Sequence, residues 1–334
     1  MTVETGPTSL ALPGIHHITA IASDPQRNVD FYIDALGLRL VKRTVNFDAP
    51  DVYHLYYGDD LGRPGAVLTF FPFPGAARGR VGAGQVSATA FSIPTASADY
   101  WTARLAEHGI ETGTETRFGE RVITLADPDG MPIELIAHAG TDPRGGWADG
   151  PVPATHAIRG FHGATLLVAE PGPTVALLTK ALDFDYLGSE NRRGRYAARG
   201  GNHAPGTLVD VLEAPRGSRG VQGAGTVHHI AYRTPDDAQQ LAWRAELLRQ
   251  GLNVTEVRDR EYFHSIYFHE PGGILYEIAT DQPGFSVDES PERLGTSLKL
   301  PPWYEGRRAQ LERALAPLTL PASNNPALTR EGQS

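Results

Sequence analysis

The chain has 334 residues, 40% of them hydrophobic, and it contains no cysteine. The lack of cysteine excludes disulfides, zinc–thiolate sites, iron–sulfur clusters and cysteine nucleophiles. The net charge is −9 and no basic stripe stands out, so we expect no nucleic-acid partner. No apolar run approaches the roughly 18 residues of a membrane span, and the N-terminus lacks the pattern of a secretion signal. We therefore expect a cytoplasmic protein without a membrane partner.

Taken in chain order, the predicted elements form four similar units, each with one strand, one helix and about three further strands. In the first unit the strand is "GIHHITA", and the helix has apolar residues at helical spacing, such as Val29, Tyr32 and Ile33. The second and fourth units match best, because "VGAGQVSATAFSIP" (81–94) aligns with "QGAGTVHHIAYRTP" (222–235). The first and third units match more weakly. Internal repeats of this kind predict a fold built from copies of one structural unit.

A unit of this composition leaves one face of its small sheet bare, so it must pair with another copy. We expect an α+β fold of two tandem domains whose four βαβββ units form barrel-like cups. The predicted divisions are an N-terminal arm (1–13), an N-terminal domain (14–138, units 14–74 and 84–138), a linker (139–159), a C-terminal domain (160–282, units 160–215 and 225–282) and a tail (283–334) with one helix and a disordered end.

The repeat alignment identifies candidate metal ligands. The last strands of the second and fourth units offer Glu134 and Glu277, each six residues after a turn proline, whereas the first unit ends in "AVLTFFPFP" without a carboxylate. We expect the first unit to face the fourth, so that one cup holds two histidines and Glu277. We expect the second unit to face the third, so that the other cup holds Glu134 alone. Four residues share one position on the first strands: His17, Ala88, Gly163 and His229.

Strand alternation selects one histidine from each doublet, because neighbouring side chains of a strand point to opposite faces. His17 shares the more polar face with Thr19, so it is the better candidate to face into the cup, and His229 is its equivalent. A single strand histidine is usually an ordinary hydrogen-bonded residue, but two doublets at equivalent positions favour a metal site. The predicted ligands are His17, His229 and Glu277. Two imidazoles and one carboxylate are typical of non-haem Fe(II) oxygenases.

Several segments resemble the vicinal oxygen chelate superfamily of glyoxalases, bleomycin-resistance proteins and extradiol dioxygenases, and more narrowly its hydroquinone-opening dioxygenases. The likeness runs from about residue 14 to 320. It rests on "GIHHITA", "VKRTVNFDAPDVYHLYYGD" (41–59), "PGAVLTFFPFP" (64–74), "TRFGER" (116–121), "VHHIAY" and "RDREYFHSIYFHEPGGILYEIATD" (258–281).

The resemblance implies Fe(II), with Mn(II) as the alternative, on the same three ligands. It also implies that His16, His228, Arg260 and Tyr267 surround the substrate oxygen and dioxygen. Simple alternation sends His16 and His228 away from the cup, so a bulge or a neighbouring unit would have to bring them near. We assign no role to His54 or His264.

We therefore expect a ring-cleaving dioxygenase that uses O2 to open a substituted hydroquinone or related dihydroxylated ring in the breakdown of aromatic compounds. In this hypothesis His228, with an ordinary pKa near 6.5, accepts the phenol proton. Tyr267 and Arg260 would stabilise negative charge on oxygen. One chain builds the whole site, so a homo-oligomer is compatible with it but not needed.

Two alternatives stay open. A glyoxalase-type isomerase or lyase usually takes a fourth protein ligand, which the last strand of the first unit does not offer. A non-catalytic small-molecule-binding protein of the same fold needs no metal ligands at all. The catechol or hydroquinone preference cannot be read from the ligands.

Overall fold

The computed structural model describes residues 10–138, 140, 142–321 and 324. Most of the predicted N-terminal arm and nearly all of the predicted disordered end lie outside these residues. No helix in the described part of the chain is long and apolar enough to cross a membrane.

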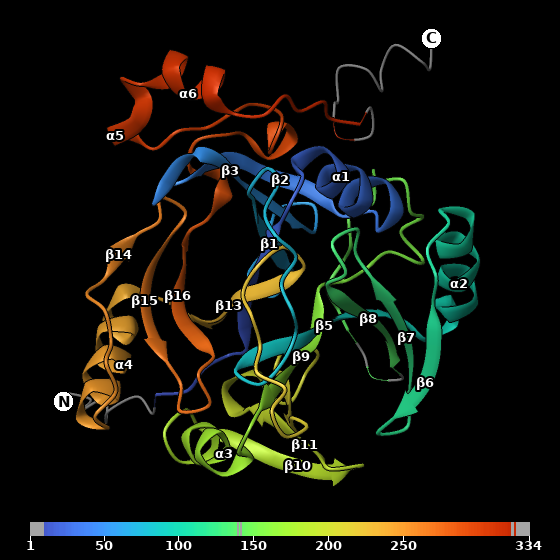
Figure 1. Ribbon diagram of the computed structural model, residues 1–334, viewed down its shortest axis with the longest axis vertical. Coiled ribbons are helices and arrows are strands. Elements are labelled where there is room, and N and C mark those ends of the chain that lie inside the picture. Colours follow the sequence, from blue (N-terminus) through green and yellow to red (C-terminus); the bar gives the residue numbers. More distant parts are fainter. Residues whose placement is uncertain (1–9, 139, 141, 322–323, 325–334) are drawn as a thin grey trace, which may run out of the picture.

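Two eight-stranded sheets curl into half-barrels, with the helices on their outer sides (Figure 1). The first sheet joins the first and fourth units. Its elements are β1 (Ile15–Ala22), α1 (Pro25–Asp30), a π-helical turn (Phe31–Ala35), β2 (Arg39–Asn46), β3 (Ala49–Gly58), β4 (Val67–Pro72), β13 (Thr226–Thr234), α4 (Asp237–Arg249), β14 (Arg258–Asp259), β15 (Phe263–His269) and β16 (Leu275–Pro283).

The second sheet joins the second and third units. Its elements are β5 (Gln85–Pro94), a 3-10 turn (Thr95–Ser97), α2 (Ala98–Glu107), β6 (Gly113–Arg117), β7 (Glu120–Ala126), β8 (Pro132–His138), β9 (Phe161–Val168), α3 (Pro171–Lys180), β10 (Phe184–Glu190), β11 (Arg193–Ala198), a 3-10 turn (Arg199–Gly201) and β12 (Leu208–Glu213).

The predicted pairing of units is confirmed. The strand orders are β14-β15-β16-β13-β1-β4-β3-β2 and β10-β11-β12-β9-β5-β8-β7-β6. In each sheet the first strands of two units run antiparallel, β1 against β13 and β5 against β9. Within a unit, the first strand lies parallel to the last, as β13 does to β16. Each sheet therefore takes one unit from each half of the sequence.

The predicted helices form on the outer side of the sheets and bury their apolar faces. In the first unit Val29, Tyr32, Ile33 and Leu36 are all fully buried. The equivalent helices of the second and fourth units each bury one tryptophan and one leucine. Because the outer face supplies the apolar contacts, the inner, concave face of each sheet is free to carry polar side chains.

The C-terminal tail packs along β2 and across the top of the first sheet in Figure 1. Lys42 on β2 is completely buried, and its Nζ lies 2.5 Å from carboxylate oxygens of both Asp288 and Glu289. The helix predicted in the tail forms as α6 (Arg308–Ala314), but it is not alone. A short helix, α5 (Pro302–Glu305), precedes it, after 3-10 turns at Phe285–Val287 and Pro291–Arg293.

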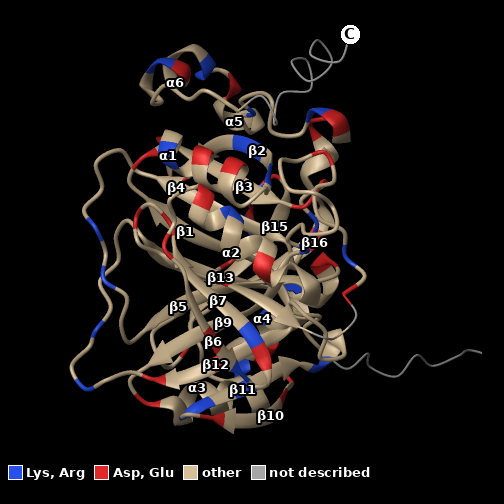
Figure 2. Ribbon diagram, turned by 90° about the vertical axis from the view of Figure 1, so that its right-hand side faces the viewer, with Lys and Arg blue, Asp and Glu red and all other residues tan. Residues whose placement is uncertain are grey.

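Acidic and basic segments are interspersed along the ribbon in Figure 2. The two connections that cross from sheet to sheet, 73–84 and 214–225, run side by side and form isolated bridges such as Arg80 with Val221.

Candidate metal centre

Three predicted ligands converge on the concave face of the first sheet, which we call the first cup. His17 lies on β1, His229 on β13 and Glu277 on β16. The Nε2 atoms of the two histidines are 3.2 Å apart, and Glu277 Oε2 lies 3.3 Å from His17 Nε2 and 2.9 Å from His229 Nε2. All three side chains are buried. They are the one group of His, Cys, Asp or Glu in the described residues whose ligand atoms could share a metal ion.

In each of these residues one side-chain atom contacts a neighbouring residue, and the other faces the remaining two predicted ligands. Ser265 Oγ donates to Glu277 Oε1, and Glu277 Oε2 is buried without a hydrogen bond. The Nδ1 atoms of His17 and His229 are occupied by neighbouring side chains. A buried carboxylate oxygen without a donor, facing two imidazole nitrogens, fits a divalent cation bound by all three.

The strands contain the bulges that the histidine doublets require. Along β1, Ile15 pairs with Tyr232 and His17 with Ala231, so His16 is an extra residue. Along β13, His229 pairs with Thr19 and Val227 with Ala20, so His228 is an extra residue. A bulge re-aims side chains locally. Both histidines of each doublet therefore approach the same side of the sheet, which simple alternation does not allow.

Burial and neighbouring charge set the ionisation of the centre. Burial alone would raise the pKa of Glu277, but His17 and His229 outweigh it and hold this pKa well below its usual range. Burial lowers the pKa of His229. Burial, followed by the charge of His229, lowers the pKa of His228 to about 4. The ordinary pKa assumed for His228 from the sequence is therefore wrong, and its imidazole is neutral at pH 7.

A cavity of about 290 Å³ adjoins the two predicted histidine ligands, near the lower end of the roughly 300–1,000 Å³ usual for ligand pockets. His17, His229, His228, Arg260 and Tyr267 line it, whereas His16 does not. The remaining lining is mostly aromatic: Asn46, Phe47, Asp48, His54, Tyr56, Phe71, Phe73, Phe263 and Leu275.

Arg260 and Tyr267 form one wall of this cavity. Arg260 Nε donates to the Tyr267 hydroxyl oxygen at 3.1 Å, and Arg260 Nη1 lies 3.2 Å from Asp48 Oδ2. Burial, and then the charge of Glu277, raises the pKa of Tyr267 above its ordinary value, so its hydroxyl keeps its proton at neutral pH. The wall thus offers a fixed cation and a neutral hydroxyl toward whatever occupies the cavity.

The position where a fourth ligand would stand carries a hydroxyl. Glu277 lies opposite Ala231, two residues beyond His229; by the same register Thr69 lies opposite Thr19, two residues beyond His17. Thr69 Oγ1 is hydrogen-bonded to His54 Nε2 at 2.8 Å.

His54 is a cavity residue that sequence reasoning left without a role. Its Nδ1 lies 2.8 Å from the Tyr56 hydroxyl, and burial lowers its pKa well below the ordinary value. In "YHLYYGD", His54 and Tyr56 are two residues apart on one strand, so the sequence already indicated that they share a face. His264, by contrast, lies away from the cavity, where its Nδ1 is 2.6 Å from Asp237 Oδ1.

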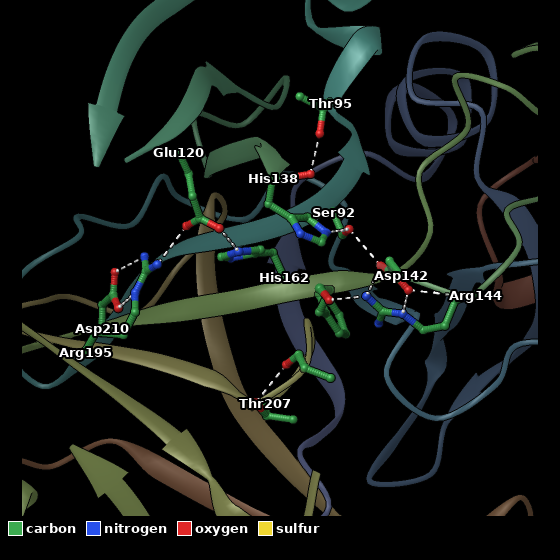
Figure 3. A network of polar contacts seen from close by, with 12 residues as sticks. Ser92, Thr95, Glu120, His138, Asp142, Arg144, His162, Arg195, Thr207 and Asp210 are labelled. Carbon is green, nitrogen blue, oxygen red and sulfur yellow. Dashed lines mark hydrogen bonds and ion pairs between the residues drawn. The ribbon is translucent and has the colours of Figure 1, made fainter. Parts of the chain in front are cut away.

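The concave face of the second sheet, the second cup, is filled. Glu134, the equivalent of Glu277, lies 2.6 Å from Arg117 Nη2. The remaining cavity is only about 10 Å³. Figure 3 shows the neighbouring network, in which Glu120 lies between His162 and Arg195, and Arg195 also pairs with Asp210. The acidic side chains of this cup are thus paired with arginine and histidine side chains.

Two half-barrels of paired βαβββ units, with ligands from the first and last strands of one pair, define a vicinal-oxygen-chelate fold. The chain matches the model of the Glyoxalase/Bleomycin resistance protein/Dioxygenase superfamily over residues 14–135 and 160–278, and it belongs to this family.

Within this family, the chain is similar to proteins that are named as dioxygenases. The chain is 46% identical over 304 residues to the "Putative ring-cleaving dioxygenase MhqO" of Bacillus subtilis, covering 91% of this chain and 96% of that protein. It is 35% identical to the "Chlorohydroquinone/hydroquinone 1,2-dioxygenase" of Sphingobium indicum, covering 90% and 95%. A solved structure of a "putative dioxygenase" from Bacillus subtilis superposes with a TM-score of 0.89 at 44% identity, covering 94% of this chain and 99% of that one.

Proposed function

We propose that the protein is an Fe(II)-dependent ring-cleaving dioxygenase that opens a hydroquinone or a substituted hydroquinone with O2, with Mn(II) as the alternative metal. The observation that carries the proposal is a donor set of two histidines and one glutamate beside an aromatic-lined cavity, with no fourth protein ligand among the described residues. Such a set leaves several metal positions open. The names of the similar proteins support the reaction class, and one of them names a hydroquinone.

In this proposal His17, His229 and Glu277 hold the metal. When bound, the metal supplies a site where an electron-rich phenolate and O2 react together, which is chemistry of the metal itself. The protein contributes orientation and the exclusion of water. The ring of a hydroquinone fits against the aromatic lining, with Phe71 and Phe263 close to the histidines.

Polar groups of the wall then act on the substrate oxygens. Arg260 supplies a permanent positive charge where negative charge develops, and the neutral Tyr267 hydroxyl supplies a hydrogen-bond partner. His228 faces the cavity, but its Nδ1 is directed at His229 at 2.8 Å. Its free ring atom is therefore Nε2. With a pKa of about 4, His228 is a better hydrogen-bonding group than a proton acceptor.

The deciding experiment is anaerobic loading with Fe(II) or Mn(II), followed by oxygen-electrode assays with a panel of hydroquinones and catechols. We expect oxygen uptake with hydroquinones and a ring-opened carboxylate product. Lack of uptake with both classes would overturn the proposal. A glyoxalase-type enzyme would instead convert methylglyoxal–thiol adducts without consuming oxygen.

The ligand assignment has its own test. We expect His17→Ala, His229→Ala and Glu277→Ala to lose most bound metal, measured by elemental analysis. Glu134→Gln in the second cup is the matched control and should keep it. A binding protein without catalysis would show ligand affinity that does not change in His17→Ala.

A further inference from the structure

Each of the two predicted histidine ligands touches the histidine that precedes it in the sequence. His16 Nδ1 lies 2.9 Å from His17 Nδ1, and His228 Nδ1 lies 2.8 Å from His229 Nδ1. The two contacts lie on different strands, yet they join the same kinds of atoms at nearly the same distance. Two independent copies of one geometry indicate a shared role.

The role follows from imidazole chemistry. A neutral histidine carries its single proton on one ring nitrogen, and the other nitrogen has the lone pair that binds a metal. The Nε2 atoms of His17 and His229 face each other and Glu277, so the proton of each ligand must sit on Nδ1. That Nδ1–H needs an acceptor, and within the described part of the chain the ring atom placed to accept it is, in each case, Nδ1 of the preceding histidine.

We propose that His16 and His228 are positioning residues that hold His17 and His229 in the Nδ1–H tautomer and fix the orientation of their rings. Metal-bound histidines usually donate this N–H to a carboxylate, a backbone carbonyl or water. Here a second neutral imidazole accepts it. The inference rests on the proposed metal ligands and adds the reason for the doublets.

The second cup supplies an internal comparison. Its first strands carry the same two bulges, and the extra residues are Ser87 on β5 and His162 on β9. His162 is thus the equivalent of His16, but Gly163 follows it where His17 would stand. His162 Nε2 lies 3.0 Å from Glu120 Oε1 instead (Figure 3). The bulge is therefore a property of the fold, whereas among the described residues the Nδ1–Nδ1 contact between consecutive histidines accompanies the two predicted ligands.

The two positioning residues differ in their access to substrate. His16 is 3% exposed, packs against Phe263 with ring centroids 5.1 Å apart, and does not line the cavity. His228 lines the cavity. A substitution at His16 should therefore change metal binding alone, and one at His228 should change both metal binding and the Michaelis constant.

The test compares variants by chelator competition for Fe(II) and Mn(II) under anaerobic conditions. His16→Leu and His228→Leu remove the acceptor, and we expect each to weaken metal affinity about 10- to 100-fold, the usual effect of losing such a partner. His16→Asn offers an amide oxygen near the position of Nδ1 and should restore most of the affinity. His162→Leu, the same substitution at the equivalent bulge, is the matched control and should leave affinity unchanged.

The outcomes separate the inference from the proposed function. If the wild-type protein binds metal and His17→Ala loses it, but His16→Leu and His228→Leu bind as tightly as wild type, the positioning role is wrong and the ligand assignment stands. If His17→Ala keeps its metal, the ligand assignment itself fails. Should His16→Leu not fold, His16→Asn and the more exposed His228→Leu still decide. An equal loss of affinity in His162→Leu would show a general packing effect and contradict the proposal.

Discussion

Arg117→Met tests whether the second cup is a structural site that is independent of the metal. Arg117 on β6 and Glu134 on β8 are 7% and 8% exposed, and their side chains are 2.6 Å apart. Glu134 has no other hydrogen bond among the described residues. The substitution therefore leaves a carboxylate beside a cavity of about 10 Å³, at the lower limit of the space that one water molecule needs.

Removing one partner of a buried ion pair costs roughly 3–5 kcal/mol, because the other charge stays buried without compensation. With an m-value of about 3 kcal/mol per molar urea, the unfolding midpoint should fall by roughly 1–1.7 M. The assay is urea unfolding followed by circular dichroism, with metal affinity measured on the folded protein. Arg117→Met combined with Glu134→Leu should recover much of the loss, since an apolar pair of similar volume replaces a buried ion pair at little cost.

Two results would refute this reasoning. A midpoint that moves by less than about 0.3 M would mean that the pair is solvated, as an exposed pair worth at most about 1 kcal/mol would be. A parallel loss of metal affinity in the folded Arg117→Met protein would mean that the two cups are coupled. We expect neither, because the proposed metal ligands and this pair lie on separate sheets.

Three further outcomes are expected. Burial would raise the pKa of Glu120, but His162 and Arg195 lower it to about 2. Glu120→Gln should therefore be less stable than wild type by its full amount above about pH 4.5, and the difference should shrink as the pH falls toward 2. Urea unfolding at several pH values measures this difference. A Glu120→Gln deficit that is constant with pH would contradict this. Tyr304→Phe removes a 2.9 Å hydrogen bond to the carbonyl oxygen of Phe47, a residue that lines the cavity. It should lower the free energy of unfolding by about 1 kcal/mol and raise the Michaelis constant without changing metal content. An unchanged Michaelis constant would show that the tail does not shape the cavity. Chelation should lower the melting temperature, since a ligand at 100 times its dissociation constant stabilises by about 2.7 kcal/mol, and a melting temperature that does not respond to metal would exclude a preformed site.

The repeat was enough to predict which units pair and that His17, His229 and Glu277, the proposed metal ligands, meet. The alignment of His17 with Gly163 and of His229 with Ala88 compares equivalent strand positions, and equivalent positions of paired units must meet across a sheet. This inference does not depend on knowing the hydrogen-bond register of the strands. The fold class and the two cups therefore follow from the sequence.

The surroundings of the ligands could not be predicted in the same way. The bulges at His16 and His228 arise from hydrogen-bond register between β1 and β13, and alternation alone gives the opposite orientation. The orientation of His54 involves a 2.8 Å hydrogen bond between its Nε2 and Thr69 Oγ1 on the neighbouring strand β4. The sequence of β3 alone does not reveal this contact. The low pKa of His228 depends on burial by distant segments. Each of these facts is a property of packing between elements rather than of one element.

The two cups show what the shared scaffold demands of its contents. Both concave faces bury acidic side chains, and a buried carboxylate must be paired. In the first cup Glu277 faces the ring nitrogens of His17 and His229, and in the proposed function a divalent cation balances its charge. In the second cup the guanidinium of Arg117 meets Glu134 directly. A guanidinium has no open position for substrate or O2, so this pairing satisfies the electrostatics of the cup and removes its chemistry. Retention of the histidine doublets in one cup alone thus explains why a molecule with two half-barrels is expected to bind one metal.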